Sequence, residues 1–176
     1  MAPPVLKQRG MTTPAKIRTY QYVNRSYDRV RASLKEKGES LFQAATRAAT
    51  ARTDALASTL KVSIQGFELG VDVHLKVYDV HDDQTPATHA PATRVRLRWE
   101  AARATALFPQ MEATLSAWPL SAEETQLEIE GTYHPPMGVV GKALDGLLFH
   151  RLAEASVHRF LEDVVEQLRK DLRVWP

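Results

Sequence analysis

The sequence predicts an α+β fold, in which an antiparallel sheet of six or seven strands packs against a long C-terminal helix, with two short helices after the first strand. Two observations carry this prediction. Over most of residues 60–133 apolar residues alternate with polar ones, which is the period of half-buried strands. From about residue 141 to about residue 172 apolar residues instead recur every three or four positions, which is the period of a helix that covers a surface.

The chain predicts a single domain over residues 16–176, preceded by a flexible N-terminal arm over residues 1–15. The opening stretch, MAPPVLKQRGMTTPAK, is rich in proline and polar residues and has no hydrophobic period, which is typical of a loose terminus. The chain has 176 residues, of which 44% are hydrophobic, and this length is enough for one hydrophobic core. We therefore expect no second independent domain.

Residues 17–23, IRTYQYV, predict the first strand because they are rich in β-branched and aromatic residues. The segments SYDRVRASLKEKG and SLFQAATRAAT then predict two short helices that separate at Gly38. Ser40 and Gln43 have the spacing of a capping box, in which the serine side chain accepts a hydrogen bond at the start of a helix. We therefore expect the second helix to begin near Ser40.

Five further segments predict the rest of the sheet. They are LKVSIQGF, VDVHLKVYDV, RVRLRWEA, QMEATLSAW and TQLEIEGTY. Each would have one apolar face, which another element must cover. The inward positions include Val73, Leu97, Trp99, Met111, Leu115, Ile129 and Tyr133. We expect Tyr20 and Tyr22 of the first strand to pack in the same core rather than to form a stacking platform for a ligand.

A helix from about Gly141 to about Leu172 would supply the cover. Pro135 and Pro136 stop the last strand, and the helix after them would be roughly 45 Å long at about 1.5 Å per residue. Steps of three and four residues give one stripe, made of Ala143, Leu147, His150, Glu154, Val157, Leu161, Val164 and Leu168. Its second half is wholly apolar, whereas its first half contains a histidine and a glutamate.

The order of these elements, with the stretch GTYHPPMGVVG before the last helix, resembles the START-like (SRPBCC) superfamily, which includes polyketide cyclases. The likeness in order spans most of residues 16–174, and the likeness in motifs is confined to about residues 97–165. The resemblance implies a helix-grip fold, in which a curved antiparallel sheet wraps around the C-terminal helix and leaves a hydrophobic cavity. Seven strands are usual there, against the six found in this sequence. The superfamily has no shared catalytic motif, so no catalytic residue is carried over.

The predicted cavity lining joins the inward sheet residues to the first half of the terminal helix. It consists of His150, Glu154, Leu147, Trp99, Leu97, Tyr133, Ile129, Leu115, Met111 and Val73. Burying an unpaired polar side chain costs about 1–3 kcal/mol. His150 and Glu154 therefore either hydrogen-bond within an ordinary core or hold the polar end of a ligand. In a third arrangement a rival strip faces the sheet and His150 points away; that strip is Leu144, Leu148 and Leu152.

The leading hypothesis is a non-enzymatic module that binds or carries a lipid, a fatty acid, a polyketide or a similar hydrophobic small molecule. The first alternative is an enzyme of the cyclase or dehydratase type, with His150, Glu154 or Tyr133 as general acid or base. The second is a protein-interaction module that uses the leucine strip, and a homodimer is compatible with it. Neither the ligand nor the oligomeric state follows from the sequence.

Composition and spacing argue against several other classes. The chain has no cysteine, which excludes disulfides and thiolate chemistry. His150, Glu154 and His158 are spaced four residues apart, so the outer two diverge by about 80° around an ideal helix, and we predict no metal site. Glycine-rich phosphate loops are missing, and we predict no cofactor. No apolar run approaches the roughly 20 residues of a membrane span, and no secretory signal is found, so we expect a cytoplasmic protein without stable membrane insertion.

A formal net charge of +2 is too small to predict a nucleic-acid partner. One predicted strand carries three arginines at alternate positions, which places their side chains on the same face. They are Arg94, Arg96 and Arg98. We expect them to form cross-strand ion pairs with acids such as Glu128 and Glu130. Contact with a phosphate or an anionic lipid is the alternative.

Overall fold

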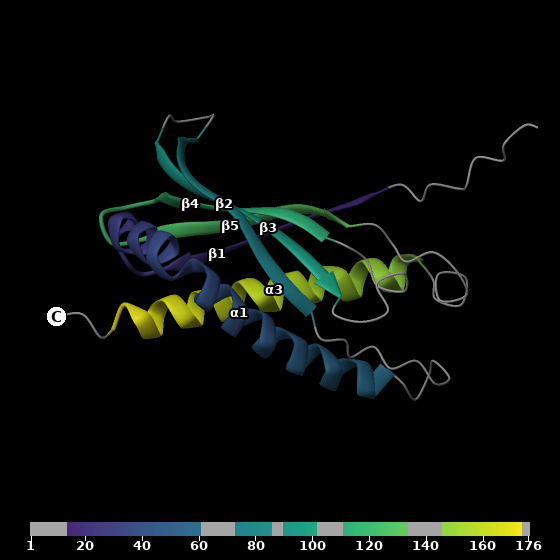
Figure 1. Cartoon of the computed structure of the whole chain (residues 1–176). Coiled ribbons are helices and arrows are strands. Elements are labelled where there is room, and N and C mark those ends of the chain that lie inside the picture. The colour runs from purple at the N-terminus through teal and green to yellow at the C-terminus, as the bar shows by residue number, and fades with distance from the viewer. Residues whose placement is uncertain (1–13, 61–72, 86–89, 102–110, 134–145, 174–176) are drawn as a thin grey trace, which may run out of the picture.

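The computed structural model describes residues 14–60, 73–85, 90–101, 111–133 and 146–173. Within these ranges the protein is α+β, with one antiparallel sheet and two helices that lie on the same face of it (Figure 1). The elements in chain order are β1 (Ala15–Val23), α1 (Tyr27–Leu60), β2 (Val73–Gln84), β3 (Pro91–Ala101), β4 (Met111–Pro119), β5 (Thr125–Tyr133) and α3 (Gly146–Asp171).

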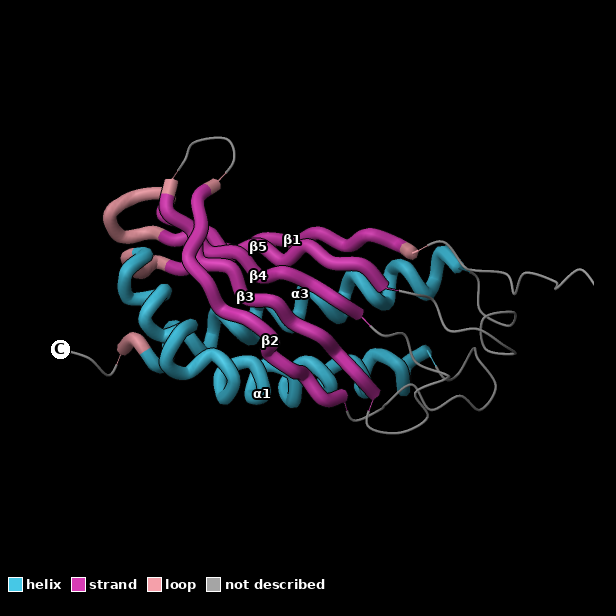
Figure 2. The backbone as a smooth tube through the Cα atoms, turned by 45° about the horizontal axis from the view of Figure 1, so that its top comes forward, coloured by secondary structure: helices cyan, strands magenta, loops and turns pink. Residues whose placement is uncertain are grey.

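The five described strands follow the order β1-β5-β4-β3-β2, and every neighbouring pair is antiparallel. The first strand is thus an edge strand that pairs with the last one, with Ile17 opposite Gly131. β2 carries an irregularity between Val77 and Asp79, and such a bulge bends a strand and increases its twist. Figure 2 shows α1 and α3 together behind the sheet. This arrangement fits the helix-grip fold that the resemblance implied.

The prediction of two short helices after the first strand is wrong. α1 is one helix of 34 residues that continues through Gly38. Glycine costs about 1 kcal/mol relative to alanine inside a helix, and burial of Leu34, Leu41 and Phe42 around it offsets that cost. Ser40 caps no helix, because its hydroxyl donates a hydrogen bond to the carbonyl of Lys37 at 3.0 Å.

The strand predictions fare better. β1 to β5 coincide with five of the six predicted segments, within a few residues at their ends. The sixth predicted segment, LKVSIQGF, starts at the last residue of α1, and its other residues lie outside the described part, so a count of six or seven strands stays a prediction. Residues 1–13 of the predicted arm also lie outside, and Ala15 already belongs to β1.

The core lies between the sheet and the two helices. The second half of the predicted helix stripe is confirmed, since Val157, Leu161, Val164 and Leu168 are all buried. They share one cluster with Leu34 and Phe42 of α1 and with Leu115, Leu127 and Ile129 of the sheet. No helix in the described ranges is both long enough and apolar enough to cross a membrane.

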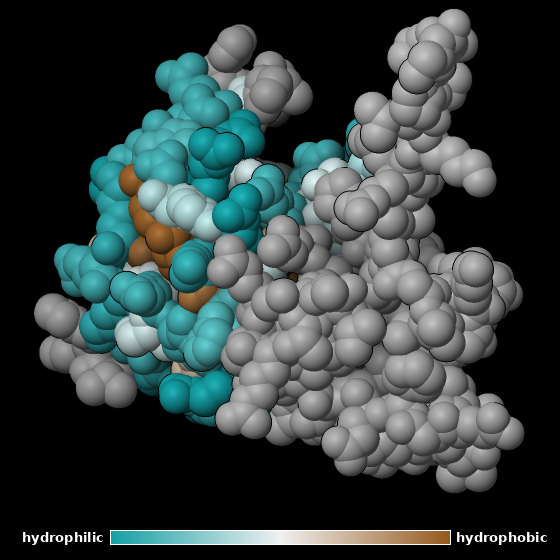
Figure 3. All heavy atoms as spheres, turned by 45° about the vertical axis from the view of Figure 1, so that its right-hand side comes forward, coloured by the Kyte–Doolittle hydropathy of each residue, from teal (hydrophilic) through white to brown (hydrophobic). Residues whose placement is uncertain are grey.

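The face drawn in Figure 3 is mainly hydrophilic where it is described. Figure 3 shows one face with a narrow band of hydrophobic atoms between hydrophilic ones. The expectation that Tyr20 and Tyr22 pack in the core is wrong, because they are 55% and 41% exposed. Alternation places the two tyrosines on the face of β1 opposite the buried Ile17 and Val23. Their rings meet edge to face there, with the ring centroids 5.7 Å apart.

Candidate ligand-binding site

A row of large side chains crosses three strands at one end of the sheet. Trp99 of β3 lies opposite Met111 of β4, which lies opposite Tyr133 of β5. Met111 and Tyr133 are buried and Trp99 is half-buried. Alternation along each strand points all three toward the helices. The sequence thus brings one indole, one thioether and one phenol into contact range on a single sheet face.

Gly131 gives this row its shape. A Cβ atom at Gly131 would lie 2.7 Å from the Cβ of Ala113 and 2.9 Å from the Cε of Met111. The end of the Met111 side chain therefore lies over the glycine, in space that any other residue would occupy. Methionine is unbranched and flexible, which makes this part of the wall adaptable to the shape of a neighbour.

Helix α3 brings short and charged side chains to the same region. Ala153 is half-buried and packs against the core cluster. Two turns further on, the helix packs against the sheet, since the rings of Phe160 and Trp99 meet edge to face with their centroids 5.1 Å apart. Between them lies Glu154, which is exposed rather than buried, contrary to its place on the predicted stripe. The stripe is displaced by one position there, because the buried contact runs through Ala153 and Phe160.

The Tyr133 hydroxyl has an unusual electrostatic setting. Burial raises the pKa of this phenol, and the nearby negative charge of Glu154 raises it further. The hydroxyl therefore stays protonated at neutral pH and can donate a hydrogen bond. Tyr133 and Glu154 are thus the two predicted polar residues that come together among the described side chains.

The remaining predicted site residues divide into two groups. Leu97, Leu115 and Ile129 are fully buried in the core, at most 2% exposed. The side chains of Val73, Leu147 and His150 lie outside the described part, as do those of the rival strip Leu144, Leu148 and Leu152. The roles predicted for these six residues stay predictions.

Sequence reasoning missed three residues beside this row, namely Leu75, Ala153 and Phe160. Leu75 of β2 lies opposite Trp99 and is buried. Its carbonyl accepts a hydrogen bond from the Gln43 side chain of α1 at 2.7 Å. The alternation of β2 did indicate Leu75, whereas the two helix residues lie one position away from the stripe and had no such signal.

His158, the third member of the rejected metal triple, has a structural role. Its Nδ1 lies 3.0 Å from Thr19 Oγ1 of β1, and its Nε2 lies 3.3 Å from a carboxylate oxygen of Glu162. The imidazole therefore ties α3 to the edge strand. Within the described ranges no group of three histidine, aspartate or glutamate side chains is placed to hold a metal ion.

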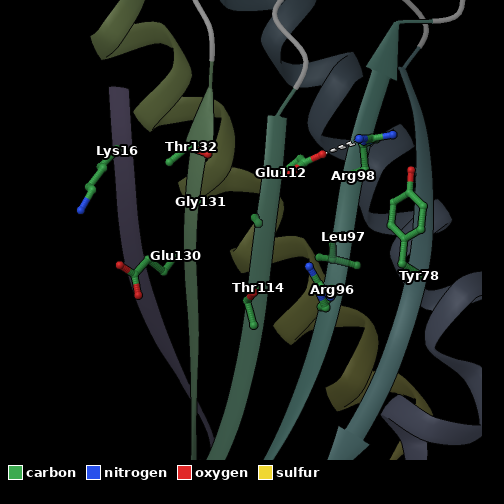
Figure 4. Close-up of a pocket in the computed structure, with 11 residues that line it drawn as sticks. Lys16, Tyr78, Arg96, Leu97, Arg98, Glu112, Thr114, Glu130, Gly131 and Thr132 are labelled. Atoms are coloured by element: carbon green, nitrogen blue, oxygen red, sulfur yellow. Dashed lines mark hydrogen bonds and ion pairs between the residues drawn. The ribbon is translucent and has the colours of Figure 1, made fainter. Parts of the chain in front are cut away.

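The opposite, helix-free face of the sheet has a hollow of about 440 Å³ (Figure 4). Its floor includes Arg96 and Arg98, two of the arginines whose alternation the sequence showed. The expected cross-strand ion pairs are confirmed for Arg94 and Arg98, but the acids named for them, Glu128 and Glu130, were wrong. Arg94 pairs with Asp83 at 2.6 Å, and Arg98 Nε donates to Glu112 at 3.1 Å. β4 separates β3 from β5, so Glu128 cannot serve β3 and instead pairs with Arg18 of β1 at 3.0 Å.

No family model matches this sequence, and no curated protein matches it. Solved structures do resemble it. The protein TTHA0849 from Thermus thermophilus is 16% identical, with 89% of this chain and 99% of that chain covered at a TM-score of 0.46. The ZhuI aromatase/cyclase from Streptomyces sp. R1128 is 13% identical, and the match covers 92% of this chain and 98% of that chain at a TM-score of 0.44. Norcoclaurine synthase from Thalictrum flavum is 13% identical, and the match covers 100% of this chain and 99% of that chain at a TM-score of 0.43. These values are too low to transfer a function to this chain.

Proposed function

We propose that this chain binds a hydrophobic small molecule, such as a lipid or a polyketide, between the sheet and the first half of α3. One observation carries the proposal. The wall formed by Trp99, Met111 and Tyr133 is apolar except for a phenol hydroxyl and an indole N–H, while the described α3 side chains that precede Phe160 include the methyl of Ala153 and the carboxylate of Glu154, whose charge acts on Tyr133. An apolar lining with a few convergent polar groups is typical of small-molecule sites.

The chemistry of this wall suggests how a ligand would be held. Apolar ligand surface would contribute affinity at about 25 cal/mol per Å² buried. The protonated Tyr133 hydroxyl would donate a hydrogen bond to a carbonyl or hydroxyl oxygen of the ligand. The negative charge of Glu154 beside it disfavours a ligand carboxylate at this position. We therefore expect the polar end of the ligand to be uncharged.

A pair of matched substitutions on α3 tests the site. Ala153 is half-buried against the core, whereas Ala155, two residues along the same helix, is exposed. Ala153→Trp would place an indole in the space assigned to the ligand, and Ala155→Trp would place the same indole in solvent. Protein purified from its native host is extracted with organic solvent, and the extract is examined by mass spectrometry.

We expect the unaltered chain and Ala155→Trp to yield the same apolar compound, and Ala153→Trp to yield at least about tenfold less with little loss of thermal stability. A region already filled by side chains gives a different result. There, Ala153→Trp would overpack the core and cost about 1–3 kcal/mol, and no chain would yield a stoichiometric compound. That outcome would contradict the proposal.

The setting of Tyr133 favours one second candidate, an acid-catalysed ring closure or dehydration. A buried phenol that stays protonated beside a carboxylate can donate a hydrogen bond that polarises a substrate carbonyl, and its raised pKa makes it a weaker acid than an exposed tyrosine. Tyr133→Phe removes the proton and retains the shape. Loss of turnover with retained binding of a polyketide-like substrate would support this candidate, and equal turnover by both chains would exclude Tyr133 as the acid.

A further inference from the structure

The helix-free face of the sheet carries a second feature that the proposed function does not use. The hollow of about 440 Å³ on this face is walled by Tyr78 of β2 on one side and by Lys16 of β1 on the other (Figure 4). Its floor is formed by β3, β4 and β5. Its volume lies in the range of small-molecule sites. The sheet itself separates it from the row of Trp99, Met111 and Tyr133.

Arg96 differs from the other arginines of β3. Arg94 and Arg98 each have a carboxylate partner on an adjacent strand. Arg96 lies between Asp79 of β2 and Thr114 of β4 in the register, and Asp79 already pairs with His81 at 2.7 Å. Arg96 is exposed, and within the described residues its guanidinium has no ion-pair partner. It therefore presents up to five N–H donors to the hollow.

The surroundings of Arg96 match an oxyanion. The hydroxyl of Thr114 lies on the neighbouring strand, and within the described residues this hydroxyl has no hydrogen-bond partner. Arg98, two residues along β3 and on the same face, adds a second guanidinium, which lies against the Tyr78 ring at 5.3 Å from its centroid. Arginine binds phosphate through two parallel N–H donors. Arg98 has Glu112 as its ion-pair partner, whereas Arg96 has no ion-pair partner within 4 Å among the described residues.

The far side of the hollow has a different character. Glu130 and Thr132 of β5 lie there beside Lys16, and in Figure 4 the Glu130 side chain points away from Arg96. A carboxylate and a hydroxyl are acceptors for ligand hydroxyl groups. We propose that this hollow binds a phosphate monoester that carries hydroxyl groups, with its phosphate on Arg96 and Thr114. The monoester is either a free metabolite or the headgroup of a membrane lipid, because both present the same chemistry.

The first experiment uses glycerol 3-phosphate as the soluble probe and glycerol as its uncharged control. Backbone amide shifts of β3, β4 and β5 are followed by NMR during titration. We expect the phosphate compound alone to shift them, and Arg96→Gln to weaken binding at least about tenfold, since charge-assisted hydrogen bonds are strong. Arg159→Gln is the matched control, because it removes the same charge from an exposed site on α3 and should leave binding unchanged.

The second experiment addresses the source of the phosphate. Co-sedimentation is measured with phosphatidylcholine vesicles that contain or lack phosphatidic acid. Binding in either experiment that Arg96→Gln abolishes and Arg159→Gln spares supports the site, and the experiment that is positive identifies a free metabolite or a lipid headgroup. Absence of binding in both experiments, or equal weakening by the two substitutions, would overturn it. Thr114→Val, which retains the charge, should weaken binding by a smaller factor. Ala153→Trp should not affect it, which separates this site from the proposed cavity.

Discussion

The two ends of the layer between α3 and the sheet are built differently. At the Leu168 end, defined by Val164 and Leu168 of α3 with Val30 and Leu34 of α1, all four side chains are 0% exposed. At the Tyr133 end, defined by Trp99, Met111 and Tyr133 with Ala153 and Glu154, the sheet side chains are also large, but the two helix side chains that precede Phe160 are a methyl group and a carboxylate. One helix thus closes a core with large apolar side chains at one end, and presents Ala153 and Glu154 before it reaches Phe160 at the other.

The polar groups near the two ends also differ, although near the Leu168 end the buried Ser33 hydroxyl has no hydrogen-bond partner among the described residues. Near the Leu168 end the Tyr27 hydroxyl lies 2.9 Å from the Thr93 hydroxyl. The Thr93 hydroxyl donates a hydrogen bond to the Asp82 carboxylate at 3.1 Å. This carboxylate also accepts hydrogen bonds from Arg31 and Lys35. Buried polar groups satisfied in this way rigidify a structure. The Tyr133 hydroxyl instead has an exposed carboxylate nearby. This difference indicates that a network between side chains fixes polar groups near one end, whereas at the other end a buried phenol lies beside the charge of an exposed carboxylate.

The largest expected effect comes from truncation at the Leu168 end. Leu168→Ala should lower the free energy of unfolding by about 2–5 kcal/mol, because the fully buried side chain leaves a cavity. The proposed function places ligand space beside Met111 at the Tyr133 end, so Met111→Ala should cost less, since a side chain beside such space loses fewer contacts. Urea unfolding of both variants measures the two values. Equal losses would break the comparison between the ends.

Gly131 offers the next largest effect. Gly131→Ala should cost about 1–3 kcal/mol, because the new methyl group would meet the Cβ of Ala113 and the carbonyl of Glu112, both at 2.7 Å. Displacement of Met111 should also alter the proposed cavity. We therefore expect the yield of extracted ligand to fall together with the unfolding midpoint. A neutral substitution would show that the Tyr133 end relaxes more easily than this packing allows.

The hydrogen bonds to Asp82 make the stability near the Leu168 end depend on pH. Hydrogen bonds from Arg31 and Lys35 hold the pKa of Asp82 well below its ordinary value. Its stabilising contribution is therefore present above the ordinary carboxyl pKa of about 3.9 and is lost as the pH falls through the lowered value. The side chain is 39% exposed, so solvent screening limits the contribution to about 1 kcal/mol at most. Asp82→Asn should remove it at neutral pH but not in strong acid, as thermal unfolding across the acid range would show.

Much of the fold could be predicted because the sheet is buried on one face only. That geometry imposes the alternation seen in β1 to β5, and the apolar second half of the α3 stripe follows from the same logic. The break at Gly38 failed as a prediction because burial of Phe42 and its neighbours, which is a tertiary effect, outweighs a local glycine cost.

The candidate site could be predicted only in part. Trp99, Met111 and Tyr133 follow from alternation, but their shared row depends on the register, which no single strand reveals. The arginine partners failed for a related reason, since strand order decides which acids can reach β3. The exposure of Glu154 was missed because a three-and-four stripe fixes a helix face only to within about one position, and α3 contacts the sheet through Ala153 instead.

The smallest expected effect is the most specific to the Tyr133 end. Burial and the charge of Glu154 together raise the pKa of Tyr133, so stability should fall as the pH rises past the ordinary pKa of tyrosine and level off above the raised one. Glu154→Gln removes the charge without changing the burial and should lower the Tyr133 pKa part of the way back. Ultraviolet absorbance of tyrosinate measures this, with Glu162→Gln as a control on the same helix. An unchanged titration in Glu154→Gln would mean that the carboxylate does not act on the phenol, and the expectation of an uncharged ligand end would lose its basis.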